Sequence, residues 1–199
     1  MKKSFASLLI IAISLGGVAN NVFAQADAGL VSGFLNTAQS ASDSQLGSIA
    51  SELTGKMQSL NTATGTNSTV AGKLDSTLKS LTGGEDSAAL SSAFKLASSA
   101  KLTPEQLGLA KQVGNLASAY VMQKNFATLD GSQGDVATIV SSLRSGKIKD
   151  ALPSLKNVAS SAKLSDTQKQ LIATIADKYA PGLSKASGAL DSLKKLPGF

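Results

Sequence analysis

The chain has 199 residues, a formal net charge of +6 and no His, Cys or Trp. These absences exclude disulfide frameworks, Cys/His zinc sites and any mechanism that needs an imidazole or a thiol. Ser (30), Ala (29) and Gly (18) dominate, and aromatic residues are only 4%. The core must therefore form from small and aliphatic side chains, and we expect no cofactor.

Residues 1–24 have the three parts of a secretory signal peptide: two lysines after the initiator Met, an apolar run over 5–18, and small residues before a cleavage site at Ala24. The apolar run is shorter than the ~20 residues that a membrane-spanning helix needs. The short positive start and compact apolar run are typical of bacterial export. We expect a periplasmic or secreted protein whose mature chain, 25–199, is a single domain.

Three helix-start signals recur along the mature chain. The hexapeptide Ala-Ser-Ser-Ala-Lys-Leu at 97–102 returns unchanged at 159–164, and a capping box follows each copy. In a capping box a Ser or Thr hydroxyl accepts from the amide three residues on, and a Gln side chain there returns to the amide of the cap. A third such pair precedes these two, so the predicted caps are Ser42 with Gln45, Thr103 with Gln106, and Ser165 with Gln168.

Apolar residues between these signals recur with the period of an amphipathic helix, and no long stretch alternates as a strand would. The spacing predicts an all-α fold of three imperfect repeats of about 62 residues, at about 25–85, 86–147 and 148–199. Each repeat holds three helices, expected at 27–41, 43–59 and 69–81, then 87–100, 104–125 and 133–145, then 150–162, 166–180 and 182–195. The stack is either a short solenoid or a compact bundle.

Glycines punctuate this pattern in two ways. One near the end of each repeat is expected to form a left-handed C-terminal cap: Gly83, Gly146 and Gly198. Three others lie inside predicted helices: Gly72, Gly108 and Gly114. Glycine inside a helix costs about 1 kcal/mol relative to Ala, so we expect these three to face neighbouring helices.

Motifs that carry chemistry are weak. Four Ser and Lys pairs have the spacing of a serine–lysine hydrolase: Ser76/Lys79, Ser92/Lys95, Ser98/Lys101 and Ser160/Lys163. No S-D-N or K-T-G partner segment accompanies them, and a chain this rich in Ser and Lys contains such pairs by chance. The acid pairs Glu85/Asp86 and Asp130/Asp135 lack the alternating spacing of a calcium loop and are interpreted as charges at helix starts.

No glycine-rich phosphate loop occurs, and the lysines are spread along the chain, so we expect no nucleic-acid partner. The sequence favours an exported, non-enzymatic helical protein that acts as a binding module or scaffold for a protein or envelope component. The alternative is an envelope- or lipid-associated protein that uses a basic, amphipathic C-terminal helix with Lys185, Lys194 and Lys195. An enzyme is the third and least favoured class.

Overall fold

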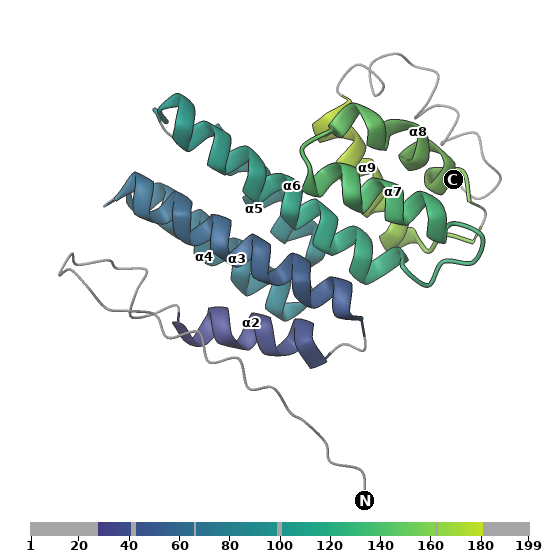
Figure 1. Cartoon of the computed structure of the whole chain (residues 1–199), viewed down its shortest axis with the longest axis horizontal. Helices are drawn as coiled ribbons and strands as arrows, with labels where there is room; N and C mark the ends of the chain where they lie inside the picture. The colour runs from purple at the N-terminus through teal and green to yellow at the C-terminus, as the bar shows by residue number, and fades with distance from the viewer. Residues whose placement is uncertain (1–27, 41–42, 66, 99–100, 162, 181–199) are drawn as a thin grey trace, which may run out of the picture.

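The computed structural model describes residues 28–40, 43–65, 67–98, 101–161 and 163–180. Within these ranges it is all-helical and contains eight helices and no strand (Figure 1). The helices are α2 (Ala28–Ser40), α3 (Ser44–Thr64), α4 (Ser68–Gly83), α5 (Asp86–Leu96), α6 (Pro104–Phe126), α7 (Gln133–Arg144), α8 (Ile148–Ala159) and α9 (Asp166–Tyr179). The helix expected at 182–195 lies outside the described residues.

α3 is longer than predicted. The sequence predicts a helix over 43–59, but the helix continues to Thr64. Asn61 is buried, and the hydroxyl of Thr64 donates to the backbone oxygen of Leu60 at 2.9 Å. The helix ends at Gly65, whose positive φ of 59° is a conformation that favours glycine.

Two helices end in the same way, with a glycine of positive φ directly after or close after the last turn. Gly84, with φ 77°, follows α4, and Gly146, with φ 73°, follows α7. In each case the next residue's amide donates back to a serine carbonyl in the last turn, at 2.8 Å after α4 and 2.9 Å after α7. The prediction of Gly83 as the first cap was wrong by one position, because Gly83 still belongs to the helix. Gly198 lies outside the described residues.

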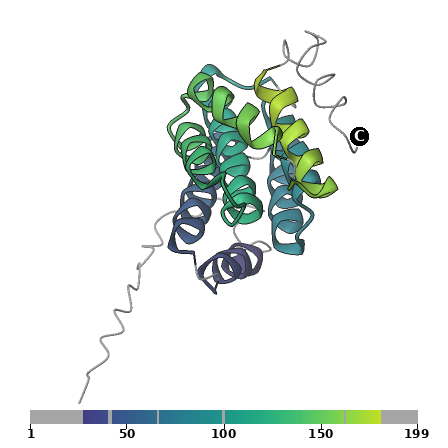
Figure 2. The same ribbon diagram turned by 90° about the vertical axis from the view of Figure 1, so that its right-hand side faces the viewer.

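α6 is the central element of the described chain. It packs against α3, α5, α7 and α9, and it runs between α2 to α4 on one side and α7 to α9 on the other (Figure 1). In the view of Figure 2, α2 lies at the lower end of the molecule and α7 to α9 lie at the upper end. Every helix contacts at least two others, so the buried side chains form a single cluster that extends from Phe34 to Ile175.

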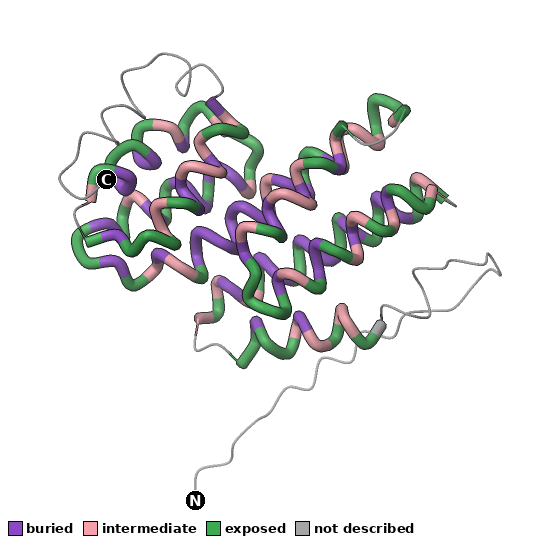
Figure 3. Tube along the Cα trace, turned by 180° about the vertical axis from the view of Figure 1, so that it is seen from behind, coloured by how far each residue is buried: buried purple, intermediate pink, exposed green. Residues whose placement is uncertain are grey.

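Burial follows the inward faces of the outer helices but covers all sides of α6 near its middle (Figure 3). Residues 116–123 are all buried. Small side chains make this enclosure possible, because Ala117, Ser118 and Ala119 let neighbouring backbones approach. The hydroxyl of Ser118 is satisfied within the helix, since it lies 2.9 Å from the carbonyl of Gly114. Because α6 is buried on all sides near its middle, its sequence shows no continuous polar stripe.

Only one of the three glycines expected to face a neighbouring helix does so. A Cβ at Gly114 would meet the Cδ1 atom of Phe94 on α5 at 3.4 Å. A Cβ at Gly72 or at Gly108 would have no atom within 4 Å. The expectation was wrong at these two positions, which border open space.

Two aromatic pairs link helices that are distant in sequence. Phe34 on α2 contacts Tyr120 on α6 with ring centroids 4.9 Å apart, and Phe94 on α5 contacts Tyr179 on α9 at 5.8 Å in an edge-to-face arrangement. Such pairs add about 0.5–1.5 kcal/mol beyond the area they bury. The chain has only two tyrosines, and both are used in this way.

Candidate functional site

α3 and α6 are tied to each other at both ends. Asp43, the N-cap of α3, accepts a hydrogen bond from the side-chain amide of Gln123 in the last turn of α6. At the opposite end, the side-chain amide of Gln106 donates to the backbone oxygen of Ala63 at 2.7 Å. The two helices therefore run antiparallel, and their register is fixed by polar contacts as well as by the core.

The predicted capping residues of α6 and α9 make both reciprocal hydrogen bonds. The backbone amide of Gln106 donates to Thr103 Oγ1 at 3.3 Å, and that of Gln168 donates to Ser165 Oγ at 3.2 Å; each return bond is 2.9 Å. The Gln168 side chain also donates to the carbonyl of Asn125 at 2.7 Å, as the equivalent glutamine does to the end of α3. These residues position helices.

The first predicted capping pair, Ser42 and Gln45, does not begin α3. The N-cap is Asp43, whose Oδ1 accepts from the backbone amides of Gln45 at 2.9 Å and Leu46 at 3.4 Å. Ser42 itself lies outside the described residues. The carboxylate of Asp43 has a second oxygen for the contact with α6, and no local sequence pattern encodes that contact.

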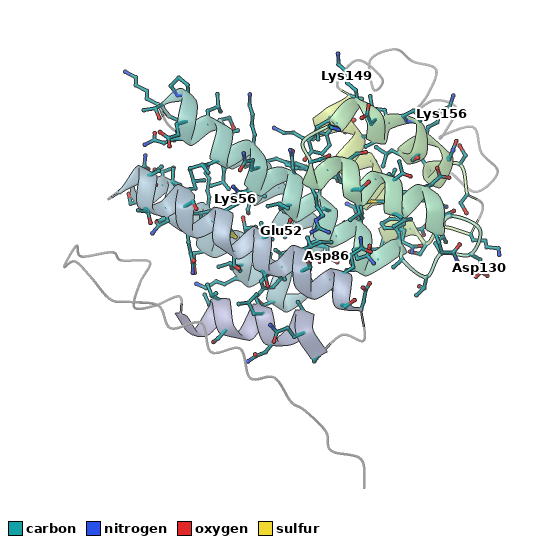
Figure 4. The ribbon with its side chains drawn as sticks, in the orientation of Figure 1. Glu52, Lys56, Asp86, Asp130, Lys149 and Lys156 are labelled. Atoms are coloured by element: carbon teal, nitrogen blue, oxygen red, sulfur yellow. The ribbon has the colours of Figure 1, made fainter. Side chains whose placement is uncertain are left out.

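An open pocket of about 570 Å³ lies where the middle of α3 faces α6 and the end of α7. Its volume is in the range of small-molecule sites, and most of its lining residues carry polar or charged side chains. The lining residues are Glu52, Gly55, Lys56 and Ser59 from α3, Gln112, Asn115 and Leu116 from α6, and Arg144, Ser145 and Gly146 from the end of α7. Glu52 and Lys56 lie one turn apart along α3 (Figure 4).

Arg144 closes one side of the pocket. Its Nε donates to Glu52 Oε2 at 3.1 Å and its Nη2 donates to Glu52 Oε1, so the guanidinium holds the carboxylate through two bonds. Nη2 also lies 3.3 Å from Ser48 Oγ. Both partners of the ion pair are partly exposed, at 28% for Arg144 and 42% for Glu52. The pair is thus in contact with solvent, and its contribution to stability is about 0–1 kcal/mol.

A buried network behind the pocket orients Asn115. Tyr179 donates to Asn115 Oδ1 at 3.0 Å, and its hydroxyl lies 3.2 Å from Ser118 Oγ. Burial raises the pKa of Tyr179 above its ordinary value, while the hydrogen bond with Ser118 acts in the opposite direction. The phenol therefore remains a donor at neutral pH, and the Asn115 amide nitrogen makes no hydrogen bond within the described residues.

The hydroxyl groups of the pocket are engaged locally. Ser59 donates to the carbonyl of Gly55 at 2.9 Å, and Ser145 lies 2.9 Å from the carbonyl of Ser141. An activated serine needs a base within hydrogen-bond reach of its hydroxyl. Neither hydroxyl makes such a contact in the part of the chain that the structure describes.

Three of the four Ser and Lys pairs noted in the sequence have the same local arrangement. The hydroxyls of Ser76, Ser98 and Ser160 donate to backbone carbonyls three or four residues earlier. They are bonded to their own helices, and none of these bonds involves a lysine side chain.

The two acids of the pair Asp130 and Asp135 bond to different partners. Asp130 is paired with Lys163 at 3.3 Å, and Asp135 accepts from Asn157 at 3.2 Å. Among the described residues no group of three or more His, Cys, Asp or Glu side chains could hold a metal ion. Five acids lie in first turns, where they complement the helix dipole: Asp86, Glu105, Asp135, Asp150 and Asp166.

Asp86 is buried and belongs to a second polar cluster. Its carboxylate accepts from Lys124 Nζ at 3.0 Å and from Asn125 Nδ2 at 2.9 Å, which joins α5 to the end of α6. Burial, and next the negative charge of Asp86, raises the pKa of Tyr120 to about 12. Every contact of this cluster is internal, so it stabilises the fold.

The basic residues proposed for lipid or partner contact, Lys185, Lys194 and Lys195, lie outside the described residues. None of the helices within the described ranges has the length and the apolar character needed to cross a membrane.

Sequence reasoning missed the pocket because its walls come from helices up to 92 residues apart. One signal was visible: the only Arg of the chain falls in the last turn of α7. No family model, curated protein or solved structure matches this chain. Over the residues that the structure describes, the molecule is an all-helical protein with an open pocket, lined in part by charged side chains, at the junction of three helices.

Proposed function

We propose that this chain is an exported, non-enzymatic binding module that holds another macromolecule against the junction of α3, α6 and α7. The observation that carries the proposal is the open pocket of about 570 Å³ with charged groups on two of its walls. Its hydroxyls are bonded to backbone carbonyls, and its lining also includes two cations, Lys56 and Arg144. Such a site suits recognition of a polar group.

Gly55 makes a sharp test possible. It lines the pocket, and a Cβ added there meets no atom within 4 Å. Gly55→Leu should therefore obstruct the pocket without unfolding α3. Gly72→Leu is the matched control, because Gly72 also borders open space inside a helix but does not line the pocket.

The experiment compares immobilised wild type with these two variants in extracts of the native envelope. A protein partner retained by the wild type and by Gly72→Leu, but lost with Gly55→Leu, supports the proposal. Equal retention by all three proteins, or no specific retention, argues against the pocket as the binding surface.

Export is proposed from the signal-peptide pattern of residues 1–24. N-terminal sequencing of the protein recovered from the periplasm or the medium should begin at Gln25. A mature protein that retains the first 24 residues, or that stays in the cytoplasm, contradicts this part of the proposal.

The three-repeat arrangement is proposed as the framework of the module. Several features with a spacing of 62 residues support it: the glycine caps at Gly84 and Gly146, the starts of α5 and α8, and the starts of α6 and α9. Two glutamines with the same spacing each bond to the helix three places earlier in the chain, Gln106 to α3 and Gln168 to α6, and each bond spans 43 residues.

The second candidate is an envelope-associated protein that binds anionic lipid through Lys185, Lys194 and Lys195. The observation that favours it is the basic, amphipathic pattern of the C-terminal segment. Co-sedimentation with anionic vesicles, lost at high salt and lost when the three lysines are replaced by Gln, supports this candidate. No sedimentation at low salt refutes it.

A further inference from the structure

We propose that the pocket at the junction of α3, α6 and α7 recognises a carboxylate of an acidic peptide segment, which Arg144 and Lys56 bind. This inference rests on the proposed binding function and names the chemistry of the partner. Four features of the pocket support it: its net positive charge, its free hydrogen-bond donors, the two-bond contact between Arg144 and Glu52, and the glycines that line it.

The charge of the pocket favours an anion. Two cations, Arg144 and Lys56, line it together with a single carboxylate, Glu52. The ion pair between Arg144 and Glu52 leaves the charge of Lys56 uncompensated at the pocket wall. Lys56 is exposed, and within the described ranges it makes neither an ion pair nor a side-chain hydrogen bond.

The free polar atoms of the pocket are mainly strong donors. Arg144 uses Nε and Nη2 for Glu52 and Ser48, which leaves both hydrogens of Nη1. Asn115 also lines the pocket; Tyr179 donates to its oxygen, and its amide nitrogen makes no hydrogen bond within the described residues. An occupant of the pocket must therefore supply acceptors, and an ionised acceptor makes the strongest bonds with such donors.

The contact between Arg144 and Glu52 shows which anion fits. The planar guanidinium already holds a carboxylate through two bonds, a geometry that matches carboxylates closely. Glu52 acts as an internal ligand that occupies part of the arginine. A carboxylate from a partner can approach from the open side and bridge the remaining donors of Arg144 to Lys56, one turn beyond Glu52 on α3 (Figure 4).

The pocket is open and bordered by glycine on two sides. Gly55 on α3 and Gly146 after α7 both line it, and an added Cβ at either position meets no atom within 4 Å. A peptide backbone that carries an acidic side chain therefore has room to approach the walls. Leu116 is the single large aliphatic residue among those that line the pocket, so specificity must come from its polar and charged groups.

The probe is a short fluorescein-labelled peptide of alternating Glu and Gly, compared with the same peptide in which Gln replaces Glu. Fluorescence anisotropy at low salt should show saturable binding of the Glu peptide and at least about tenfold weaker binding of the Gln peptide. Lys56→Gln and Arg144→Gln should each weaken binding of the Glu peptide about 5–10-fold. Arg144→Lys, which keeps the charge but loses the planar fork, should weaken it less.

Glu52→Gln provides the opposite test, because it frees the donors of Arg144. It should strengthen binding of the Glu peptide about 3–5-fold. Lys149→Gln is the charge-matched control: Lys149 lies on α8, away from Glu52 and Lys56 (Figure 4). It should change binding less than about twofold.

The inference is overturned if the Glu peptide does not bind, if Lys149→Gln weakens binding as much as Lys56→Gln, or if Glu52→Gln weakens it. It is also overturned if inorganic phosphate or citrate displaces the peptide at concentrations below those of the peptide itself, because the site would then select a small free anion. Circular dichroism verifies that each variant is folded. Loss of envelope capture with Gly55→Leu, together with no binding of the peptide, would refute the acidic ligand and leave the proposed binding function standing.

Discussion

The carboxylate of Asp43 joins the start of α3 to the end of α6 through its two oxygens. Oδ1 accepts from the backbone amide of Gln45 at 2.9 Å, and Oδ2 accepts from the side-chain amide of Gln123. Gln123 is buried, so its amide has few other partners. One side chain thus caps a helix and fixes the antiparallel pair whose middle forms two walls of the pocket.

Asp43→Ala should lower the free energy of unfolding by about 1–3 kcal/mol, because it removes an N-cap and leaves the Gln123 amide unsatisfied. Asp43→Ser keeps a capping oxygen and should cost less. Ser42→Ala, at the position that the sequence predicts as the cap, should change stability by less than about 0.5 kcal/mol. Urea denaturation measures all three, and equal losses for Ser42→Ala and Asp43→Ala would contradict Asp43 as the cap.

Gly114→Leu should lower the thermal midpoint, with a loss of about 1–3 kcal/mol from overpacking against Phe94. Gly108→Ala should have the opposite effect and raise the free energy of unfolding by about 0.5–1 kcal/mol. Alanine stabilises a helix relative to glycine, and its Cβ enters open space at this position. Differential scanning calorimetry of the two variants provides an internal comparison. An unchanged midpoint for Gly114→Leu would show that α5 does not approach α6 closely.

Gln168→Glu should separate the two roles of Gln168. A Glu at this position can still accept from the backbone amide of Ser165, since Glu and Gln both serve in capping boxes. It cannot donate to the carbonyl of Asn125, so we expect a loss of about 0.5–1.5 kcal/mol. A chemical denaturation midpoint equal to that of the wild type would mean that this interhelix bond adds nothing.

The tyrosines of the folded protein should resist ionisation. The pKa of Tyr120 is raised to about 12 by burial and next by Asp86, and burial also raises that of Tyr179. The chain has no Trp, so tyrosinate absorbance reports these two residues alone. Asp86→Asn should bring the titration of Tyr120 to lower pH. A full absorbance step at pH 10 in the folded protein would contradict the burial of both rings.

This shift makes stability depend on pH in the alkaline range. In the unfolded chain Tyr120 loses its proton near the ordinary value of 10.0, whereas the folded protein retains it up to about 12. The stabilisation is complete below pH 10 and is lost as the pH rises from about 10 to 12, a change of about 2–3 kcal/mol. Denaturant midpoints across this range should fall less steeply for Tyr120→Phe than for the wild type.

Local signals in the sequence were enough to predict the eight helices of the described residues. The periodicity and the capping boxes place the starts of α6 and α9 at Pro104 and Asp166, because both determinants lie within one turn of each start. At Asp43 and Ser42 the sequence presents two cap-forming residues side by side. Asp43 also accepts from Gln123, which is 80 residues away, and neighbouring sequence does not encode that contact.

The predictions that were wrong at glycine positions also depend on contacts that the local sequence does not encode. Gly83 and Gly84 are adjacent and chemically equivalent, and only the register of the last turn decides which one takes a positive φ. Whether a glycine inside a helix faces a neighbour depends on the packing of helices, which period alone does not determine. The pocket was missed for a related reason, since Glu52 and Arg144 meet only after three helices have assembled.

The glycine at position 55 has a consequence for selectivity. An alanine there would add about 1 kcal/mol of helix stability and meets no steric obstacle. Because glycine has no side chain, it leaves space at the wall of the pocket that a larger residue would fill. A graded series of Ala, Val and Leu at this one position would narrow the entrance stepwise. If the pocket binds as proposed, this series should change the size of the group that it accepts and leave the charges of Arg144 and Lys56 in place.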